Sequence, residues 1–302
     1  MELRQLRYFV NVVDMGSLSK AAATLSVTQP SLSQQISNME YKLGVPLLLR
    51  SSSGVRPTDA GAKLYHHARL VLRQMQDLEA DVVVDGSGAV GQVAIGLPTS
   101  MAAVLGPQLV KRLAKDHPSV RLQLFESVSG YLLELLANGR LDLAVLFRET
   151  ETPGLRIRPL FTERLSVFGA LVTDRCEGDT CDLTQLAGVP LVLPDRSNGL
   201  RLLVERAFAQ ARIELNVIAE IDSLPVMLAL AQQGVAATIN SAAVARGTVP
   251  AIPARRLVNP AIERPVSLCQ PTDIPQTAAA LAAEETIRTL VRESLGLWDL
   301  AR

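Results

Sequence analysis

Apolar positions at helical spacing predict three short helices in the first 44 residues. The first helix has an apolar residue at every third or fourth position and ends at Gly16. The second follows at once and ends near Leu25. Thr28 is a favourable N-cap for the third helix, which accepts Pro30 in its first turn and ends at Gly44. The residues expected to bury these helices are Leu3, Leu6, Val10, Val13, Leu32, Ile36, Met39 and Leu43.

The outward face of the third helix is polar but almost uncharged. Between Lys20 and Lys42 there is no basic residue, and Glu40 carries the only charge. Two short helices, a tight turn and a further helix with a polar outer face are typical of a helix-turn-helix. Amide and hydroxyl side chains donate and accept hydrogen bonds, so they can recognise base edges in the major groove. Taken alone, the same pattern also fits a solvated surface.

The segment behind these helices predicts a two-stranded wing. Residues 47–50 form a short apolar strand that ends in a base, 51–54 form a turn, and 55–57 return. Such a hairpin is placed to lie along the neighbouring minor groove. Cations that can attract the DNA phosphates are Arg4, Lys20, Lys42, Arg50, Arg56 and Lys63.

A heptad stripe predicts a long helix from a cap at Thr58 to about Asp85. Its apolar residues are spaced 4, 3, 4, 3 and 4 apart, as in the seam of a coiled coil. Packing on the core of its own domain is the alternative. We favour dimerisation, because a lone long helix beside a small winged domain has little else to cover its apolar stripe. Dimerisation also pairs two recognition helices and so demands a two-fold-related operator. The seam residues are Leu64, Ala68, Val71, Met75, Leu78 and Val82.

Beyond a Gly- and Ser-containing hinge at 85–89, short apolar strands alternate with amphipathic helices. This alternation predicts an α/β domain with a parallel-rich sheet and crossover helices. The expected strands are 93–97, 120–126, 141–147, 165–171, 191–193, 216–221 and 235–239. The expected helices are 103–116, 130–138, 200–211, 224–233 and 277–293.

Composition and charge place these elements in an ordinary globular chain. Its 302 residues are 48% hydrophobic and suffice for two or three domains. Thirty basic and thirty acidic residues cancel overall, but residues 1–76 hold nine basic against four acidic ones (9 − 4 = +5). The first module is therefore mildly basic. Charges interrupt residues 1–20, and no run of eighteen apolar residues exists, so we expect a cytoplasmic protein without a membrane partner.

Three linked motifs give the first sixty residues a specific resemblance. AAATLSVTQPSLSQQISNME, LGVPLLLR and GVRPTDAG resemble, in sequence and spacing, the DNA-binding domain of the LysR-type transcriptional regulators. Many members of that family have arginine at the position of Gln34 and a base at the position of Ser53, so both departures lower the expected nonspecific phosphate affinity. The resemblance and the outward face together imply DNA contacts at Thr28, Gln29, Pro30, Ser31, Ser33, Gln34, Ser37, Arg50, Ser53 and Arg56.

The second half continues the resemblance. GQVAIGL, ESVSGYLLELLANGRLDLAVLF, LAGVPLVLPDRSNGLRLLVERA and EIDSLPVMLALAQQGVAATI are similar to the family's effector-binding domain, which has the two-lobed fold of type 2 periplasmic binding proteins. ESVSG and EIDSLPVML also resemble the nitrogen-assimilation subgroup. The implied organisation is a winged helix-turn-helix at 1–58, a linker and dimerisation helix with its hinge at 59–89, and an effector-binding domain at 90–302. The implied lobes are lobe I, about 90–162 and 267–302, and lobe II, about 163–266.

Hydroxyl side chains gather at the expected ligand site of this fold. Ligands bind there at strand C-termini, where the free N–H groups and dipoles of helix N-termini favour a small anion such as a carboxylate. Ordinary helix capping is the alternative for each residue taken alone. Phe147 and Ile239 can form apolar walls, and Asn240 stands where many members have proline. The expected effector-binding residues are Thr99, Ser100, Ser129, Phe147, Ser197, Asn198, Arg201, Ser223 and Ile239.

Catalysis and metal binding find little support in the sequence. The only histidines are His66, His67 and His117, two of them on the linker helix, and no catalytic triad, P-loop or dinucleotide fingerprint is found. Cys176 and Cys181 flank a four-residue segment and are close enough to pair if oxidised, although no neighbouring base is evident to lower a thiol pKa. A thiol-based redox-responsive regulator, or a metal bound by this pair, remains the alternative.

We therefore expect a sequence-specific DNA-binding transcriptional regulator that needs no cofactor. Its expected partners are double-stranded DNA with an inverted-repeat operator, a small-molecule effector, a second copy in a homodimer, further copies in a homotetramer, and RNA polymerase.

Overall fold

The computed structural model of the chain describes residues 1–51, 54–83, 88–173, 175–176, 178–245 and 252–294. The chain divides into two compact units. The first contains residues 1–91 with 138–140, and the second contains 92–137 and 141–302. Across the described ranges, the structure contains no helix with the length and apolar character needed to cross a membrane.

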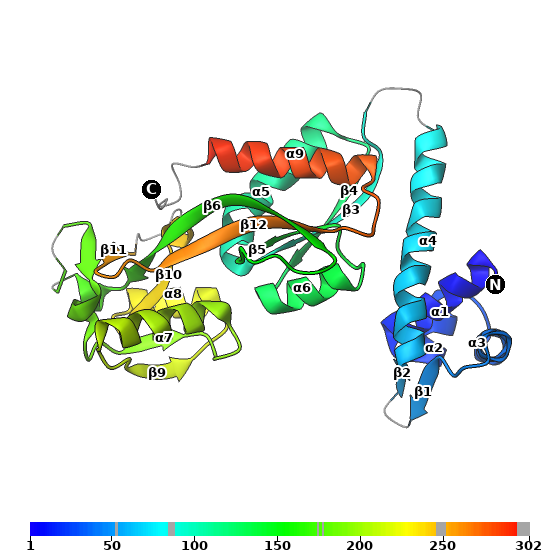
Figure 1. The fold of residues 1–302 in the computed structure, drawn as a ribbon, viewed down its shortest axis with the longest axis horizontal. Helices are drawn as coiled ribbons and strands as arrows, with labels where there is room; N and C mark the ends of the chain where they lie inside the picture. The colour runs from blue at the N-terminus through cyan, green and yellow to red at the C-terminus, as the bar shows by residue number, and fades with distance from the viewer. Residues whose placement is uncertain (52–53, 84–87, 174, 177, 246–251, 295–302) are drawn as a thin grey trace. The chain divides into compact units, whose positions relative to one another are not determined.

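The first unit is a helical core with a two-stranded hairpin. Thr58 caps the last helix by accepting a hydrogen bond from the Gly61 amide at 3.0 Å. The interior of the unit contains Phe9, Val12, Leu32 and Ile36, all fully buried. The predicted helix-turn-helix and wing are confirmed as elements (Figure 1). They are α1 (Leu3–Met15), α2 (Leu18–Thr24), α3 (Gln29–Leu43), β1 (Leu48–Ser51), β2 (Gly54–Pro57) and α4 (Asp59–Val83).

Local residue choices explain where α3 begins and ends. Thr28 has extended backbone, and its hydroxyl accepts a hydrogen bond from the Ser31 amide at 3.4 Å. Pro30 occupies the first turn, where its missing N–H removes no helical hydrogen bond. Gly44 ends the helix with φ 70°, a left-handed conformation that glycine adopts without steric cost.

The long helix α4 packs on the same core through its first turns. A Cβ atom added to Gly61 would lie 2.0 Å from the carbonyl oxygen of Leu47, so the helix approaches the residue before β1 more closely than a larger residue allows. Tyr65 donates a hydrogen bond to Asp14 of α1, and Arg69 donates to the Tyr65 hydroxyl at 3.2 Å. Burial, together with the bond to Asp14, raises the pKa of Tyr65.

The heptad seam of α4 is divided between two environments. Leu64 and Ala68 belong to the helical core of the first unit, with Ala68 only 1% exposed. Further along, Val71 and Leu78 are 43% and 56% exposed. Met75 is half-buried, and the side chain of Val82 lies outside the described part. The first half of the seam therefore packs on the core of its own unit, as in the alternative to dimerisation. The second half exposes apolar side chains to solvent.

The second unit is built on one curled mixed sheet with helices against it. The strand order is β4-β3-β5-β12-β6-β11-β7, β10 also pairs with β6, and β8 and β9 form a separate parallel pair. The strands are β3 (Gly91–Leu97), β4 (Val120–Glu126), β5 (Leu143–Leu146), β6 (Leu155–Phe168), β7 (Thr180–Asp182), β8 (Leu191–Leu193), β9 (Val217–Glu220), β10 (Thr238–Ser241), β11 (Ala254–Val258) and β12 (Glu263–Pro271). The α-helices are α5 (Thr99–Asp116), α6 (Ser129–Ala137), α7 (Gly199–Ala211), α8 (Leu224–Gln232) and α9 (Ala278–Glu293).

Separate apolar cores give this unit two lobes. One core lies between α6, β5 and the end of β12 and includes Leu132 and Leu136. Two others lie around α7 and α8 and include Phe208 and Met227. Lobe I is the part around β3, β4, β5, α5 and α6, and lobe II is the part around α7, α8 and β7 to β11. The long strands β6 and β12 run side by side from one lobe to the other (Figure 1).

Three features of this sheet correct the sequence prediction. The helices fall within a few residues of their expected positions, but the central pair β6 and β12 is antiparallel, so the sheet is mixed rather than parallel-rich. Only the end of β6 was expected, as 165–171, and β7, β11 and β12 were missed. The reason lies in β6 itself: charged residues interrupt its apolar run, and a half-exposed strand lacks the hydrophobic signal of a buried one.

Candidate DNA-binding surface and ligand cavity

The uncharged face of α3 is exposed on the first unit. Thr28, Gln29, Pro30 and Ser31 lie at its N-terminus, and all four are exposed. One turn on, the exposed Gln34 donates to the Asn38 side chain at 3.0 Å. Ser33 and Ser37 are half-buried, and Arg56 is exposed on β2. Ser53 lies outside the described residues. The structure thus brings the expected α3 residues together on one surface.

A polar contact ties the recognition helix to the wing. Arg50 of β1 donates from Nη1 to the Ser33 hydroxyl at 3.0 Å, and its Nη2 lies 3.8 Å from Glu40. Glu40 also accepts hydrogen bonds from the amides of Leu47 and Leu48 at 2.8 and 3.2 Å. This carboxylate therefore holds the first residues of the wing against α3. Arg50 fixes the wing to the helix, and its remaining N–H groups can reach a phosphate.

The second unit contains a cavity between its two lobes. It holds about 500 Å³ of space, including the part that is open to solvent. Lobe I contributes the N-termini of α5 and α6, and lobe II contributes the N-termini of α7 and α8. Helix N-termini present free N–H groups and a positive dipole end to a ligand. Its lining consists of Pro98, Thr99, Ser100, Ser127, Val128, Ser129, Phe147, Pro194, Asn198, Leu200, Asp222, Leu224, Met227, Asn240 and Arg264.

A buried ion pair forms the floor of the cavity. Arg264 of β12 stands directly opposite Glu163 of β6 in the strand register. Its Nε and Nη2 donate to Glu163 Oε1 at 2.8 and 2.5 Å, and the Ser241 hydroxyl donates to Glu163 Oε2 at 2.5 Å. The guanidinium also lies 3.6 Å from the centre of the Phe147 ring. Arg264 and Glu163 are 3% and 0% exposed, so the pair joins the two neighbouring strands inside the protein.

Five of the nine expected effector residues line this cavity. Thr99, Ser100 and Ser129 do so from lobe I, Phe147 follows β5, and Asn198 precedes α7. The Ser129 hydroxyl oxygen is buried and has no hydrogen-bond partner in the described part of the chain. Asn198 also accepts a hydrogen bond from the Leu200 amide at 3.0 Å, so the capping alternative holds for it as well.

The other four expected residues do not line the cavity. Ile239 is fully buried in the core around α7, and Ser223 is exposed without a capping hydrogen bond to α8. The Ser197 hydroxyl donates to Asp195 at 2.6 Å. Together with the Ser197 amide, this contact holds the pKa of Asp195 below its ordinary value.

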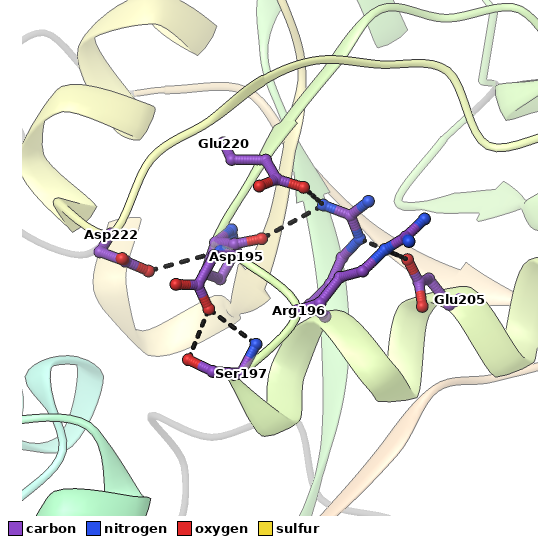
Figure 2. A network of polar contacts seen from close by, with 8 residues as sticks. Asp195, Arg196, Ser197, Glu205, Glu220 and Asp222 are labelled. Atoms are coloured by element: carbon purple, nitrogen blue, oxygen red, sulfur yellow. Dashed lines mark hydrogen bonds and ion pairs between the residues drawn. The ribbon is translucent and has the colours of Figure 1, made fainter.

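Arg201 takes part in a polar network beside the cavity rather than lining it. Figure 2 shows Glu220, Glu205 and the residues around Asp195 in this network. Arg201 donates to Glu205 at 2.9 Å, to Glu220 at 3.3 Å and to the Pro194 carbonyl at 3.2 Å. Its guanidinium therefore supports the loop that carries Asp195.

Arg264 and Asp222 line the cavity but were not among the expected effector-binding residues. Asp222 stands beside Ser223 at the N-terminus of α8, where the strand-to-helix junction could have drawn attention to it. Arg264 offered no comparable signal, because it lies on a strand that was not predicted. Both line the cavity and together supply its charged side chains.

The cysteines lie in the second unit and are not among the residues that line the cavity. Cys176 and Cys181 are joined by a disulfide, and both belong to the apolar core around α7. Cys269 on β12 is a free, buried thiol, and burial raises its pKa to about 11. Within the described ranges, no group of three or more His, Cys, Asp or Glu residues is arranged to hold a metal ion.

A winged helix-turn-helix joined to an α/β unit with a cavity between two lobes is the architecture of a ligand-responsive DNA-binding protein. Residues 3–62 match the bacterial regulatory helix-turn-helix protein of the lysR family, and residues 86–292 match the LysR substrate binding domain. The chain belongs to the LysR family: it is a DNA-binding transcriptional regulator with an effector-binding domain. Transcriptional regulators of this kind are not typically enzymes.

The chain is similar over most of its length to two regulatory proteins and to one solved structure. The nitrogen assimilation regulatory protein nac of Escherichia coli (strain K12) is 33% identical over 294 residues, which are 96% of this chain and 95% of that protein. The protein of the same name from Klebsiella aerogenes is 38% identical over 247 residues, which are 82% and 80% of the two chains. Full-length CbnR complexed with its target DNA is 27% identical, with a TM-score of 0.58 and coverage of 96% of this chain and 100% of that chain.

Proposed function

We propose that the chain binds an inverted-repeat operator as a dimer and that a small effector in the lobe cavity alters this binding. The observation that carries the proposal is the exposed, uncharged N-terminal face of α3. Gln29, Ser33 and Gln34 can exchange hydrogen bonds with base edges, whereas the cations Arg50 and Arg56 on the wing supply phosphate contacts. The tie between Arg50 and Ser33 keeps helix and wing in one orientation on the duplex.

The second half of α4 supports the dimer. Val71 and Leu78 present apolar side chains at heptad spacing and are exposed in the single chain. Packing two such helices together removes this surface from water and sets two α3 helices at a spacing that matches two half-sites. The proposal includes a homotetramer formed by pairs of dimers and contact with RNA polymerase at the regulated promoter. The proposed domain bounds are 1–58, 59–89 and 90–302.

The cavity supports an effector with an anionic group. Ser100 and Ser129 offer hydroxyl donors at helix N-termini, and Arg264 supplies a buried cation at the floor. The cavity lies between the lobes. A ligand that contacts both lobes therefore changes the free-energy difference between their open and closed arrangements.

Selection of bound duplexes from a random pool tests the DNA-binding proposal. We expect enrichment of two half-sites related by a two-fold axis, because a symmetric dimer presents two identical recognition helices. A Leu78→Glu variant places a charge in the proposed seam and is expected to sediment as a smaller species. It should bind the selected duplex about 10²-fold more weakly, because the second half-site is no longer tethered. Enrichment of a single asymmetric site by the wild-type chain would contradict the dimer.

Thiol-based regulation is a second candidate, favoured by the disulfide between Cys176 and Cys181. If it operates, operator affinity differs between protein treated with dithiothreitol and protein treated with diamide, and the Cys176→Ser/Cys181→Ser variant abolishes that difference. Cys269→Ala is the control and should leave the difference intact, because a thiol with a pKa of about 11 stays protonated at neutral pH. Equal wild-type affinity under both conditions rules this candidate out.

A further inference from the structure

The cavity of the second unit is electrostatically polarised. On the side of lobe I, Ser100 and Ser129 lie in the first turns of α5 and α6, where backbone N–H groups and helix dipoles favour negative charge. The Ser129 hydroxyl is buried without a partner among the described residues, so it can donate a hydrogen bond to a ligand. This half of the cavity suits a carboxylate.

The buried cation at the floor strengthens this preference. Arg264 is 3% exposed, yet it lines the cavity. Its contacts with Glu163 use Nε and Nη2, and Nη2 also lies 3.5 Å from the Ser100 hydroxyl. Within the described chain, Nη1 has no hydrogen-bond partner, so the guanidinium retains donors for a ligand. Both Glu163 oxygens are occupied, one by Arg264 and one by Ser241, which holds the cation in a fixed position.

The opposite wall carries a negative charge. Asp222 of lobe II lines the cavity, and its carboxylate accepts a hydrogen bond from the Asp195 amide at 3.5 Å (Figure 2). No ion pair of Asp222 is present in the part of the chain that the structure describes. The two nearby carboxylates already have partners, because Glu220 pairs with Arg201 and Asp195 accepts two hydrogen bonds from Ser197. Asp222 is therefore the carboxylate that a ligand in the cavity meets.

We propose that the effector is an α-amino acid, bound as a zwitterion across this cavity. Its carboxylate lies against Arg264, Ser100 and Ser129, and its ammonium group lies against Asp222. A simple carboxylate leaves Asp222, which is exposed to water, without a ligand contact, and a simple amine meets the positive ends of the helix dipoles. The apolar residues Leu200, Leu224 and Met227 receive the side chain. This inference rests on the proposed effector site and adds the chemical class of its ligand.

Thermal unfolding of the purified full-length chain with each of the twenty common L-α-amino acids tests the inference. At least one should raise the unfolding temperature in a saturable way, because a ligand that binds only the folded state stabilises it. For each amino acid that binds, the amine without the carboxylate and the acid without the ammonium group are titrated beside it. We expect both to bind at least about tenfold more weakly, because each lacks one charged hydrogen-bonding group.

Two variants locate the charges. Asp222→Asn should weaken amino-acid binding at least about tenfold, whereas Glu220→Gln, a neighbouring carboxylate outside the cavity lining, should leave it unchanged. A Glu163→Gln/Arg264→Met double variant removes both partners of the buried pair, so no charge is left unpaired and the fold is retained. It should keep its operator binding and lose amino-acid binding.

Several outcomes would overturn the inference. They are the absence of binding by all twenty amino acids, wild-type affinity in Asp222→Asn, and tighter binding of the simple acid than of the amino acid. Operator binding is measured on the same preparations. A chain that selects its duplex but binds no amino acid refutes the ligand class and leaves the proposed function intact, whereas amino-acid binding without any duplex preference refutes the DNA-binding proposal alone.

Discussion

Glu163→Ala is expected to destabilise the effector-binding unit by about 3–5 kcal/mol. The carboxylate is fully buried and pairs with Arg264, which is itself 3% exposed. Removing it leaves a guanidinium without a counter-charge and deprives the Ser241 hydroxyl of its acceptor. The pair also joins β6 to β12, the two neighbouring strands that run from one lobe to the other. Urea denaturation followed by circular dichroism measures the change.

Two controls separate the buried charge from the removal of a side chain. The Glu163→Gln/Arg264→Met variant loses both charges and should be much closer to the wild type in stability. Glu263→Ala, one position before Arg264, breaks a partly exposed pair with Arg164 and should cost no more than about 1 kcal/mol. Equal stability of Glu163→Ala and Glu263→Ala would contradict the role assigned to the buried pair.

Gln29→Ala is expected to weaken binding to the selected duplex by about 1–3 kcal/mol and to relax base preference at one position. Gln29 is exposed at the N-terminus of α3 and has no side-chain partner among the described residues, so its amide is free to exchange two hydrogen bonds with a base. Fluorescence anisotropy with the selected duplex and with single-base variants measures both effects. Binding to random DNA should change little.

Lys20→Ala is the control for Gln29→Ala, because it should weaken binding to every sequence and not to the selected duplex alone. Lys20 is exposed on α2, and a phosphate contact from it should weaken binding about equally on all sequences and reduce the salt slope by about 1. If Gln29→Ala loses the same free energy on specific and random duplexes, Gln29 contacts the backbone and not a base.

The helices of both units were predictable because the signals that specify them are local. Thr28 and Gly44 mark the ends of α3 within its own sequence, and the apolar spacing between them defines its buried face. Thr99, Ser100, Ser129 and Asn198 were predictable as cavity residues for a related reason. Each lies where a strand passes into a helix, and this fold gathers such junctions at one place.

Arg264 and Glu163 were not predictable in this way. They are 101 residues apart in the chain and meet only because β6 and β12 pair in one register. Arg201 shows the reverse case: its position in a helix N-terminus favoured a ligand contact, but Glu205, four residues on, is one of its partners. The i,i+4 spacing could have indicated that pair from the sequence.

The residue order alone defines a DNA-binding head, a long amphipathic helix and an α/β effector unit, because caps, breakers and apolar periods act over a few neighbouring positions. Tertiary structure decides which residues of one sequence pattern are buried and which stay exposed. One stripe on α4 divides into Ala68, which is buried in the core of the first unit, and Leu78, which stays exposed, although both obey the same heptad spacing. The charges of the cavity are likewise set by contacts across the fold, since burial and partner choice depend on which distant strands and loops meet.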